Sequence, residues 1–526
     1  MQPVTQSGRY IPLDILRGAA LLGVLLVNLL TLFRVSLFAQ ITGTAGPATA
    51  IDGVVSAIVY NLIEFKAFTL FSFLFGAGIA VQQERQSRPA AFLARRFLVL
   101  LAIGLTHIVF IWNGDILTLY AVCGLLAIPL LGFPSPALAV VGGALILIAY
   151  YVPMPIAFPS TEVMKAQAVE ATRVYATGGF AEIQAFRWSE TTRLIVPLLL
   201  LSLPKTLGVM LLGVAAWRSH CFTKRRELWL PVLLISAAAG LAGIFLHIEM
   251  LAQIPLAFAY AAALLLWVPK APLLAAGGQM ALTNYLTESV VFSLVFYGFG
   301  LGLMGRVGIT TAAAGGLAFY VAQLFCSRFW LRHFHFGPVE WLWRSLTYGR
   351  RQPMLKNEVT VSRAGARVIT VLVFLVGAPA VHLGVPWLIS RISPRWGPNW
   401  WGLCLVALGM AGLVWLLTAS LGEIAQMPEP IKLGLRPARL VQTGPYSYAR
   451  HPMYVAELLL WLGVALYAGS PVVLAVMVTG AVIARYVISI EERALESYFG
   501  GEYRSFRERV PFFPDFKAHP PAGRHP

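Results

Sequence analysis

The sequence is poor in charged residues, and acidic side chains are particularly few. Only 12% of its 526 residues are charged, with 23 Asp and Glu against 40 Lys and Arg. Soluble domains carry roughly 25% charged residues, so this composition excludes an ordinary soluble enzyme. Hydrophobic residues make up 58% of the chain, which excludes a disordered protein, because so apolar a chain does not stay solvated as coil.

Cysteine is also scarce, and its spacing excludes two further classes. The four cysteines lie far apart, and none belongs to a spacing typical of zinc sites or disulfide frameworks. We therefore expect no metal. The surplus of 17 positive charges would indicate nucleic acid in a soluble protein. In a membrane protein the same surplus arises from basic cytoplasmic loops, so we expect a lipid bilayer and no nucleic-acid partner.

Long apolar runs recur along the whole chain. A membrane-spanning helix needs about 20 largely apolar residues. The sequence therefore predicts an all-α integral membrane protein, a polytopic helical bundle of about fourteen transmembrane helices in which the last pair is a spanning or re-entrant hairpin. The runs lie at 15–38, 54–81, 92–112, 116–133, 136–157, 194–217, 229–247, 250–268, 280–303, 309–331, 367–390, 400–420, 453–467 and 470–490.

Basic residues alternate between the predicted loops, and a polar stretch divides the chain. Arg and Lys gather after the second, sixth and tenth spans, whereas the intervening loops contain almost none. The basic loops and both termini should then face the cytoplasm. We expect 158–193, which mixes acids and bases, to be an external loop. The basic stretch at 333–366 interrupts the apolar pattern, so we expect two modules, 1–355 and 356–526, and we find no repeat that relates them.

The most specific motif of the chain is LVQTGPYSYARHPMYVAELL at 440–459, which is followed by ISIEERALESYFGGEYRSFRERVPFFP at 488–514. A helical hairpin would bring its RHP segment to the EE pair at one cytoplasmic surface, in a polar cluster that also holds Tyr503. Each charge alone could be an interfacial anchor. Together these segments resemble the isoprenylcysteine carboxyl methyltransferase and phospholipid methyltransferase family over roughly 360–516, with Ala456 where Gly is usual and Phe506 where Tyr is common.

This resemblance implies a methyltransferase that binds S-adenosylmethionine at the cytoplasmic ends of these helices. It implies that Arg450, His451 and Tyr454 hold the carboxylate and adenosine of the cofactor. Glu491 would contact its amino or ribose groups, and Glu492 would order the pocket. His451 could also accept a proton from an amine or thiol, whereas a carboxylate acceptor would need no base. We expect a lipid-like or hydrophobic acceptor whose nucleophile the sequence leaves open.

Ionisable residues inside the N-terminal spans indicate a second candidate site, because charge in apolar surroundings is costly. His107 lies one to two turns before Asp115, and Glu64 lies in the outer half of the second span. These three could form a cluster that opens outward. The structural alternative for His107 is a hydrogen-bonded core histidine.

Two basic residues are further candidates. Arg17 is spaced to pair with Asp14 on one helix face, and such a pair is often structural. Lys205 follows Pro204, so it could instead bond the carbonyls that the proline frees.

Five N-terminal segments carry a second resemblance. RYIPLDILRGAALLGVLLVN, FTLFSFLFGAG, GLTHIVFIWNGDILTLYA, ALTNYLTESV and FGPVEWLWRSLTYG resemble the bacterial YeiB-type family over about 9–350. That family is similar to transmembrane acyltransferases such as the heparan-glucosaminide acetyltransferases, which use cytoplasmic acyl-CoA. The analogy implies that His107 is a general base or acyl carrier oriented by Asp115, with Arg17 and Lys205 at the acyl donor. A bacterial family also implies the inner (plasma) membrane.

Other interpretations stay open. A transporter or exporter module fused to a modifying methyltransferase would also contain many spans and buried charges, although we find none of its typical inverted repeats. An inert anchor or scaffold fits the convergent ionisable residues less well. The segment 300–305 matches GxGxxG in letters but follows an apolar helix rather than a strand, so we expect close helix packing there. The sequence does not indicate an oligomeric state.

Overall fold

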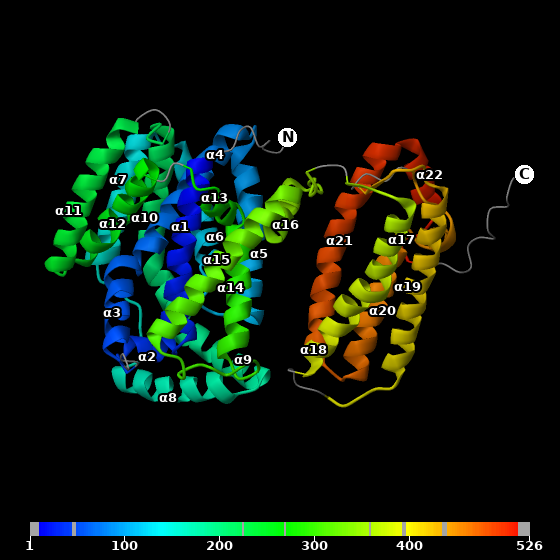
Figure 1. Ribbon diagram of the computed structural model, residues 1–526, viewed down its shortest axis with the longest axis horizontal. Coiled ribbons are helices and arrows are strands. Elements are labelled where there is room, and N and C mark those ends of the chain that lie inside the picture. The colour runs from blue at the N-terminus through cyan, green and yellow to red at the C-terminus, as the bar shows by residue number, and fades with distance from the viewer. Residues whose placement is uncertain are drawn as a thin grey trace, which may run out of the picture. The chain divides into compact units, whose positions relative to one another are not determined.

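A computed structural model describes residues 10–44, 49–222, 226–267, 270–356, 359–391, 396–433 and 439–513. Its contacts divide the chain into two compact units, Met1–Tyr348 and Gly349–Pro526 (Figure 1). Among the described residues, nine helices are long and apolar enough to cross a membrane, and five shorter apolar helices accompany them. The predicted all-α membrane architecture with about fourteen apolar helices is therefore confirmed.

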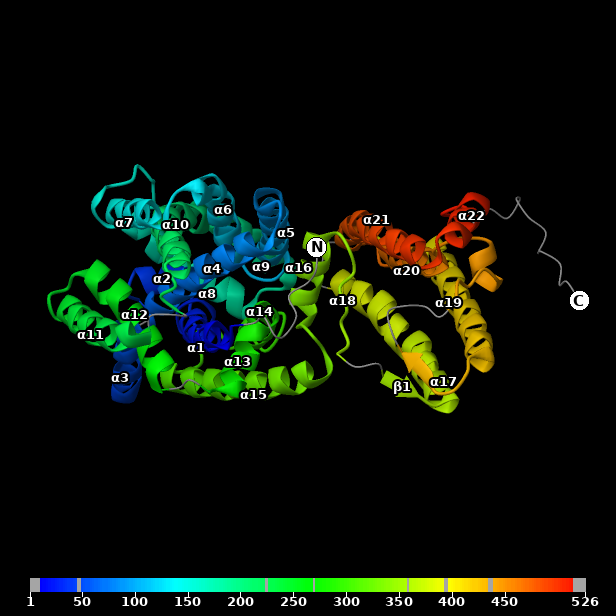
Figure 2. The same cartoon turned by 90° about the horizontal axis from the view of Figure 1, so that it is seen from above.

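The first unit is a helical bundle in which α1 is surrounded by other helices (Figure 2). Apolar residues on several faces of α1 explain this position, since a helix that is apolar all round is buried. The elements of the unit are α1 (Ile11–Asn28), η2 (Leu29–Phe33), α2 (Leu37–Ile41), α3 (Ala50–Ile58), η3 (Val59–Ile63), α4 (Lys66–Arg85), α5 (Pro89–Phe110), α6 (Leu117–Ala127), η4 (Ile128–Gly132), α7 (Ser135–Tyr151), α8 (Thr161–Thr177), α9 (Phe180–Glu190), η5 (Thr191–Ile195), α10 (Val196–Arg218), η6 (Arg226–Leu228), α11 (Trp229–Phe245), α12 (Glu249–Trp267), α13 (Pro272–Gln279), α14 (Ala281–Phe296), α15 (Ile309–His333) and α16 (Pro338–Tyr348).

Glycines let α4 and α10 approach closely. A Cβ added to Gly76 would lie 1.9 Å from the carbonyl oxygen of Met210, and one added to Gly213 would lie 2.0 Å from that of Phe73. Both distances are far below van der Waals contact, so only glycine fits at either position. Small residues at such crossings are typical of packed membrane helices.

Three predictions about the first unit are wrong. The expected loop at 158–193 is helical: it contains α8, which lies across one end of the unit, and α9, which continues through a π-helical turn into α10 (Figure 1). α8 buries Ala168, Ala171 and Val174 at helical spacing, which explains why a mixed-charge segment folds. The expected span at 54–81 is interrupted between η3 and α4, where Phe65 adopts φ 61°.

The third error concerns the glycines at 300–305. The helix predicted over 280–303 ends at Phe296, and the glycines lie in the loop beyond it. Gly302 and Gly305 have φ of 63° and 74°, in the left-handed region that favours glycine. Turn geometry explains Gly302 and Gly305, and the predicted close packing holds in part. A Cβ added to Gly300 would lie 1.9 Å from the carbonyl oxygen of Leu294 on α14, and one added to Gly302 would lie 2.6 Å from that of Ala176 on α8.

The second unit is a smaller helical bundle with a short ribbon. Its strands pair antiparallel, with Val359 opposite Leu433; strands of three residues are too short to be predicted from alternation. The elements are β1 (Val359–Val361), α17 (Arg363–Leu372), η7 (Val373–Gly377), η8 (Ala380–Gly384), α18 (Val385–Arg391), α19 (Trp401–Gln426), β2 (Ile431–Leu433), η9 (Gly444–Ser447), α20 (Pro452–Tyr467), α21 (Pro471–Phe499) and α22 (Gly501–Arg509).

Candidate functional site

The start of α20 and the far end of α21 meet in the second unit. α20 begins at Pro452, a residue suited to the first turn, and a tight turn at Gly469 reverses the chain into α21. A single oxygen of Glu492, Oε1, lies 3.1 Å from Nη1 of Arg450 and 3.1 Å from Nε2 of His451. One carboxylate thus fixes both basic side chains of the RHP segment.

Tyrosines surround the second carboxylate of the pair. Glu491 interacts with the phenols of Tyr454 and Tyr446. Burial raises the pKa of Tyr446, and the charge of Glu491 raises it further. The structure therefore brings together all five residues that the sequence singles out in this unit: Arg450, His451, Tyr454, Glu491 and Glu492.

Tyr503 on α22, which the sequence places in this polar cluster without a specific role, completes it. Its side chain is 1% exposed, and burial raises the pKa of its phenol to about 12, so the hydroxyl stays protonated at neutral pH. No described residue pairs with this hydroxyl or with Nε of Arg450. Both are donors, and both lie in the electrostatic neighbourhood of Glu491 and Glu492. Two free donors beside a carboxylate pair can bind a ligand that carries both an anionic and a cationic group.

A second polar cluster lies further along α20. His382 Nε2 is 3.3 Å from Glu457 Oε1, and Trp461 donates a hydrogen bond of 3.1 Å to Nδ1 of His382. Tyr454, Glu457 and Trp461 recur at helical spacing, so the polar face of α20 continues beyond the Arg450 cluster. The sequence signal was available, because Glu457 is an ionisable residue inside a predicted span.

In the first unit the loop between α5 and α6 returns an aspartate to a histidine. His107 Nδ1 lies 3.0 Å from Asp115 Oδ1, and Asp115 Oδ2 accepts a 2.7 Å hydrogen bond from the backbone N–H of Thr118 at the start of α6. Both side chains are 1% exposed. An acceptor at Nδ1 favours the tautomer that leaves the lone pair on Nε2. No described residue pairs with that Nε2.

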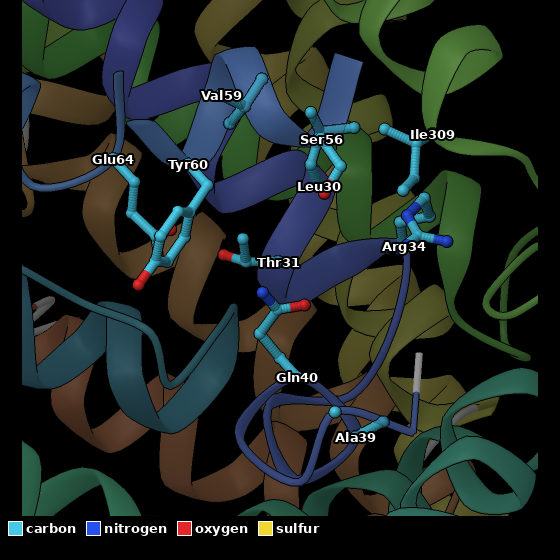
Figure 3. Close-up of a pocket in the computed structure, with 11 residues that line it drawn as sticks. Leu30, Thr31, Arg34, Ala39, Gln40, Ser56, Val59, Tyr60, Glu64 and Ile309 are labelled. Carbon is cyan, nitrogen blue, oxygen red and sulfur yellow. The ribbon is translucent and has the colours of Figure 1, made fainter. Parts of the chain in front are cut away.

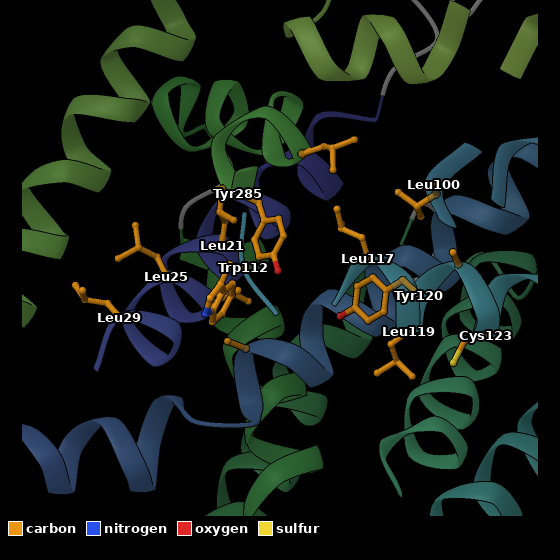
Figure 4. Packing of buried hydrophobic residues seen from close by; sticks show 14 of the residues in the cluster. Leu21, Leu25, Leu29, Leu100, Trp112, Leu117, Leu119, Tyr120, Cys123 and Tyr285 are labelled. Carbon is orange, nitrogen blue, oxygen red and sulfur yellow. The ribbon is translucent and has the colours of Figure 1, made fainter. Parts of the chain in front are cut away.

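Two aromatic residues of the apolar core, Trp112 and Tyr285, pack near this histidine; both are labelled in Figure 4. Its ring centroid lies 5.4 Å from that of Tyr285 and 6.1 Å from that of Trp112. One turn after Tyr285, the buried carboxylate of Glu288 has no hydrogen-bond partner among the described residues. A buried polar atom without a partner is rare in native proteins and indicates a functional group or a ligand.

Glu64 lies elsewhere in the same unit. It lines a pocket together with Leu30, Arg34 and Tyr60, and neither His107 nor Asp115 is among the described residues that line it (Figure 3). The helix break that follows Glu64 explains the separation, because the predicted continuous span would have placed it differently. The structure thus brings together only two of the three residues predicted to cluster, His107 and Asp115. Glu64 lines a pocket that neither of them lines.

The two basic candidates occupy separate places. Arg17 forms an ion pair of 3.0 Å with Asp14, at the predicted spacing. Lys205 donates a hydrogen bond to Gln253 and lies 5.2 Å and 5.1 Å from the ring centroids of Phe65 and Tyr150. Its ammonium therefore binds side chains of other helices.

Some ionisable residues that are buried in the first unit were not predicted as candidate site residues. Arg34 lies inside the predicted first span and was therefore detectable. Arg187 and Glu190 lie in the segment predicted as a loop, so their burial could not be foreseen. Glu190 accepts hydrogen bonds from Asn113 and Tyr175. Within the described ranges, no group of three or more His, Cys, Asp or Glu could hold a metal ion.

These features define a polytopic membrane protein of two helical units, the second of which carries a charged site on a helical hairpin. A family model described as "Phospholipid methyltransferase" matches residues 399–502, and one described as "Protein of unknown function (DUF418)" matches residues 205–350. No solved structure matches the chain.

Three curated relatives each match part of the chain. YxaH of Bacillus subtilis is 31% identical over 400 residues, which cover 68% of this chain and 98% of YxaH. YeiB of Escherichia coli is 28% identical over 392 residues, covering 66% of this chain and 99% of YeiB. The cobalt-zinc-cadmium resistance protein CzcN of Cupriavidus metallidurans is 36% identical over 123 residues, which cover 23% of this chain and 54% of CzcN. The chain belongs to the YeiB-type family and carries a C-terminal phospholipid methyltransferase domain.

Proposed function

We propose that the second unit transfers the methyl group of S-adenosylmethionine to a lipid-like or hydrophobic acceptor. The observation that carries this proposal is the pair of unpartnered donors, Arg450 Nε and Tyr503 OH, beside the carboxylates of Glu491 and Glu492. The methionyl part of the cofactor carries a carboxylate and an ammonium, which match these donors and acceptors. The family match supports methyl transfer.

The residues of this unit bind the cofactor and align it with the acceptor, and they need not activate its methyl group. When bound, the cofactor supplies a sulfonium methyl that is already a good electrophile. Arg450 and Tyr503 would donate hydrogen bonds to its carboxylate, and Glu491 would accept hydrogen bonds from its ammonium. Glu492 holds Arg450 and His451 in place. The apolar helices exclude water, and alignment in a dry site supplies much of the rate enhancement. If the acceptor is an amine or a thiol, His451 is the candidate base that would take its proton.

The test is calorimetric binding of S-adenosylhomocysteine to the full chain in nanodiscs. We expect saturable binding to the wild type and at least tenfold weaker binding to Arg450→Gln and Glu491→Gln. Arg439→Gln is the matched control, because Arg439 is exposed and pairs with Glu423 instead. Absence of binding to a monodisperse wild type would overturn the proposal.

We also infer acyl transfer for the first unit. The supporting observation is the His107–Asp115 pair, whose Nε2 has no described partner and can take a proton from an acceptor hydroxyl or amine. The donor would be acyl-CoA. Incorporation of radiolabelled acetyl groups into a membrane fraction, lost in His107→Gln and retained in the exposed control His333→Gln, would support this role. Equal labelling with both variants would exclude His107.

We further propose that the protein lies in an inner (plasma) membrane with both termini in the cytoplasm. Its support is the alternation of basic loops along the sequence. Modification of single cysteines by a membrane-impermeant thiol reagent in intact cells tests it. We expect labelling at Thr42 in the variant Thr42→Cys and protection at Ser87 in Ser87→Cys. The reverse result would invert the orientation.

A further inference from the structure

A polar pocket of the first unit lies among η2, α2, α3, η3 and the start of α15. Its volume is about 190 Å³, far above the roughly 15 Å³ that one water needs. Apolar residues form part of its wall, as in most small-molecule sites. Its polar lining consists of Thr31, Arg34, Gln40, Ser56, Tyr60 and Glu64 (Figure 3).

Two π-helical turns build this pocket. The first, η2 at Leu29–Phe33, contributes Leu30 and Thr31 to the wall, and its C-cap residue is Arg34. The second, η3 at Val59–Ile63, contributes Val59 and Tyr60, and its C-cap residue is Glu64. Single π turns inside α-helices are rare and are frequent at functional sites. Here each of the two turns ends on a charged side chain of the same pocket.

The two charges face the pocket from opposite sides. In Figure 3, Glu64 and Arg34 lie at opposite ends of the labelled residues, with Thr31 between them. Arg34 is 8% exposed, and its Nε has no hydrogen-bond partner among the described residues. A guanidinium that reaches a cavity with an unused donor can bind an anionic oxygen.

The neighbouring counter-charges are already engaged. Asp52, which attracts Arg34 electrostatically, accepts hydrogen bonds from the N–H and the hydroxyl of Thr310. Lys66, which attracts Glu64, donates to the backbone carbonyl of Tyr60. Neither Asp52 nor Lys66 lines the pocket among its described residues. The pocket therefore presents one cationic and one anionic side chain to whatever enters it.

We propose that this pocket binds a small zwitterionic group, one that carries a primary ammonium and a carboxylate or phosphate a few bonds apart. Arg34 binds the anionic end and Glu64 the ammonium, and the hydroxyls and amide between them satisfy the remaining donors and acceptors. A ligand of one charge would match only one of the two charged side chains, and a cationic ligand would leave the buried Arg34 without an anionic partner in the pocket. Neither methyl transfer nor acyl transfer is required for this binding.

Two sources can supply such a group, and one experiment separates them. The full chain is placed in nanodiscs of phosphatidylglycerol alone, and its thermal midpoint is measured against phosphoethanolamine and glycine. Ethanolamine and inorganic phosphate, added singly, are the half-ligand controls. A second set of nanodiscs contains phosphatidylethanolamine. A saturable rise with the small zwitterions identifies a soluble ligand, and a rise only with phosphatidylethanolamine identifies a lipid head group.

Substitutions of pocket residues test whether the response to zwitterions comes from this pocket. We expect Arg34→Met and Glu64→Gln each to weaken the zwitterion response at least tenfold. Ser56→Phe fills the pocket without changing charge and should abolish the response, which keeps the test valid if a charge variant does not fold. Glu170→Gln, on the exposed face of α8, is the matched control. The proposal is overturned if wild type responds to no zwitterion, or equally to ethanolamine or phosphate alone.

Discussion

Replacing Tyr503 with phenylalanine should stabilise the unliganded protein and weaken cofactor binding. The hydroxyl is buried, and no described residue pairs with it. An unsatisfied buried polar group costs about 1–3 kcal/mol, so removing it should stabilise the second unit by about 1 kcal/mol. For a domain of 150–250 residues this corresponds to a rise of about 2–4 °C in the unfolding midpoint. A hydrogen bond to a charged group contributes about 1.5–3 kcal/mol, so the affinity for S-adenosylhomocysteine should fall roughly 10- to 100-fold.

Scanning fluorimetry and calorimetry on the same nanodisc preparation measure both effects. Tyr467→Phe is the matched control, because Tyr467 ends α20 at the opposite end from the site and packs against Trp400. We expect little change in either measurement for that variant. A Tyr503→Phe protein that is less stable than wild type and binds the cofactor equally well would refute the reasoning and make Tyr503 a structural residue.

Three further predictions concern the first unit. Gly213→Val should lower the thermal midpoint by several degrees or prevent folding, because its Cβ would lie 2.0 Å from the carbonyl oxygen of Phe73; an unchanged midpoint would contradict the close α4–α10 crossing. Glu340→Ala should destabilise the unit by about 2 kcal/mol in denaturant unfolding, because it removes the acceptor of two backbone N–H groups at the start of α14; a change below about 0.5 kcal/mol would contradict this. Asp115→Asn should strongly reduce acyl transfer, because it disturbs the tautomer of His107. Full acyl-transfer activity in labelled membranes would argue against a catalytic role of the pair.

The helix count was predictable because each apolar run is long enough to be read from composition alone. The breaks were not. The π turn at Val59–Ile63 contains neither proline nor glycine, so nothing local marks the interruption before Phe65. Tertiary packing determines where this helix breaks. Beside the break, Glu64 lines a pocket that His107 does not line.

In the two sites, contacts between neighbouring helices were predictable, whereas contacts that depend on tertiary packing were not. His107 and Asp115 meet because a helix end and a short turn suffice to join them, which sequence spacing can indicate. The hairpin that joins Arg450 to Glu492 was likewise inferred from two apolar runs and a motif. The motif also places Tyr503 in this cluster, but not its role as a buried donor, because its surroundings depend on how α22 folds back after α21.

The hairpin has a consequence for biosynthesis. The His107–Asp115 pair needs only two consecutive helices, so it can close while the ribosome is still translating the first unit. The cluster of Arg450, Glu492 and Tyr503 can close only after α21 has entered the membrane and α22 has emerged. A nascent chain therefore passes through a stage in which the first unit is assembled and the RHP segment still lacks its carboxylate partner.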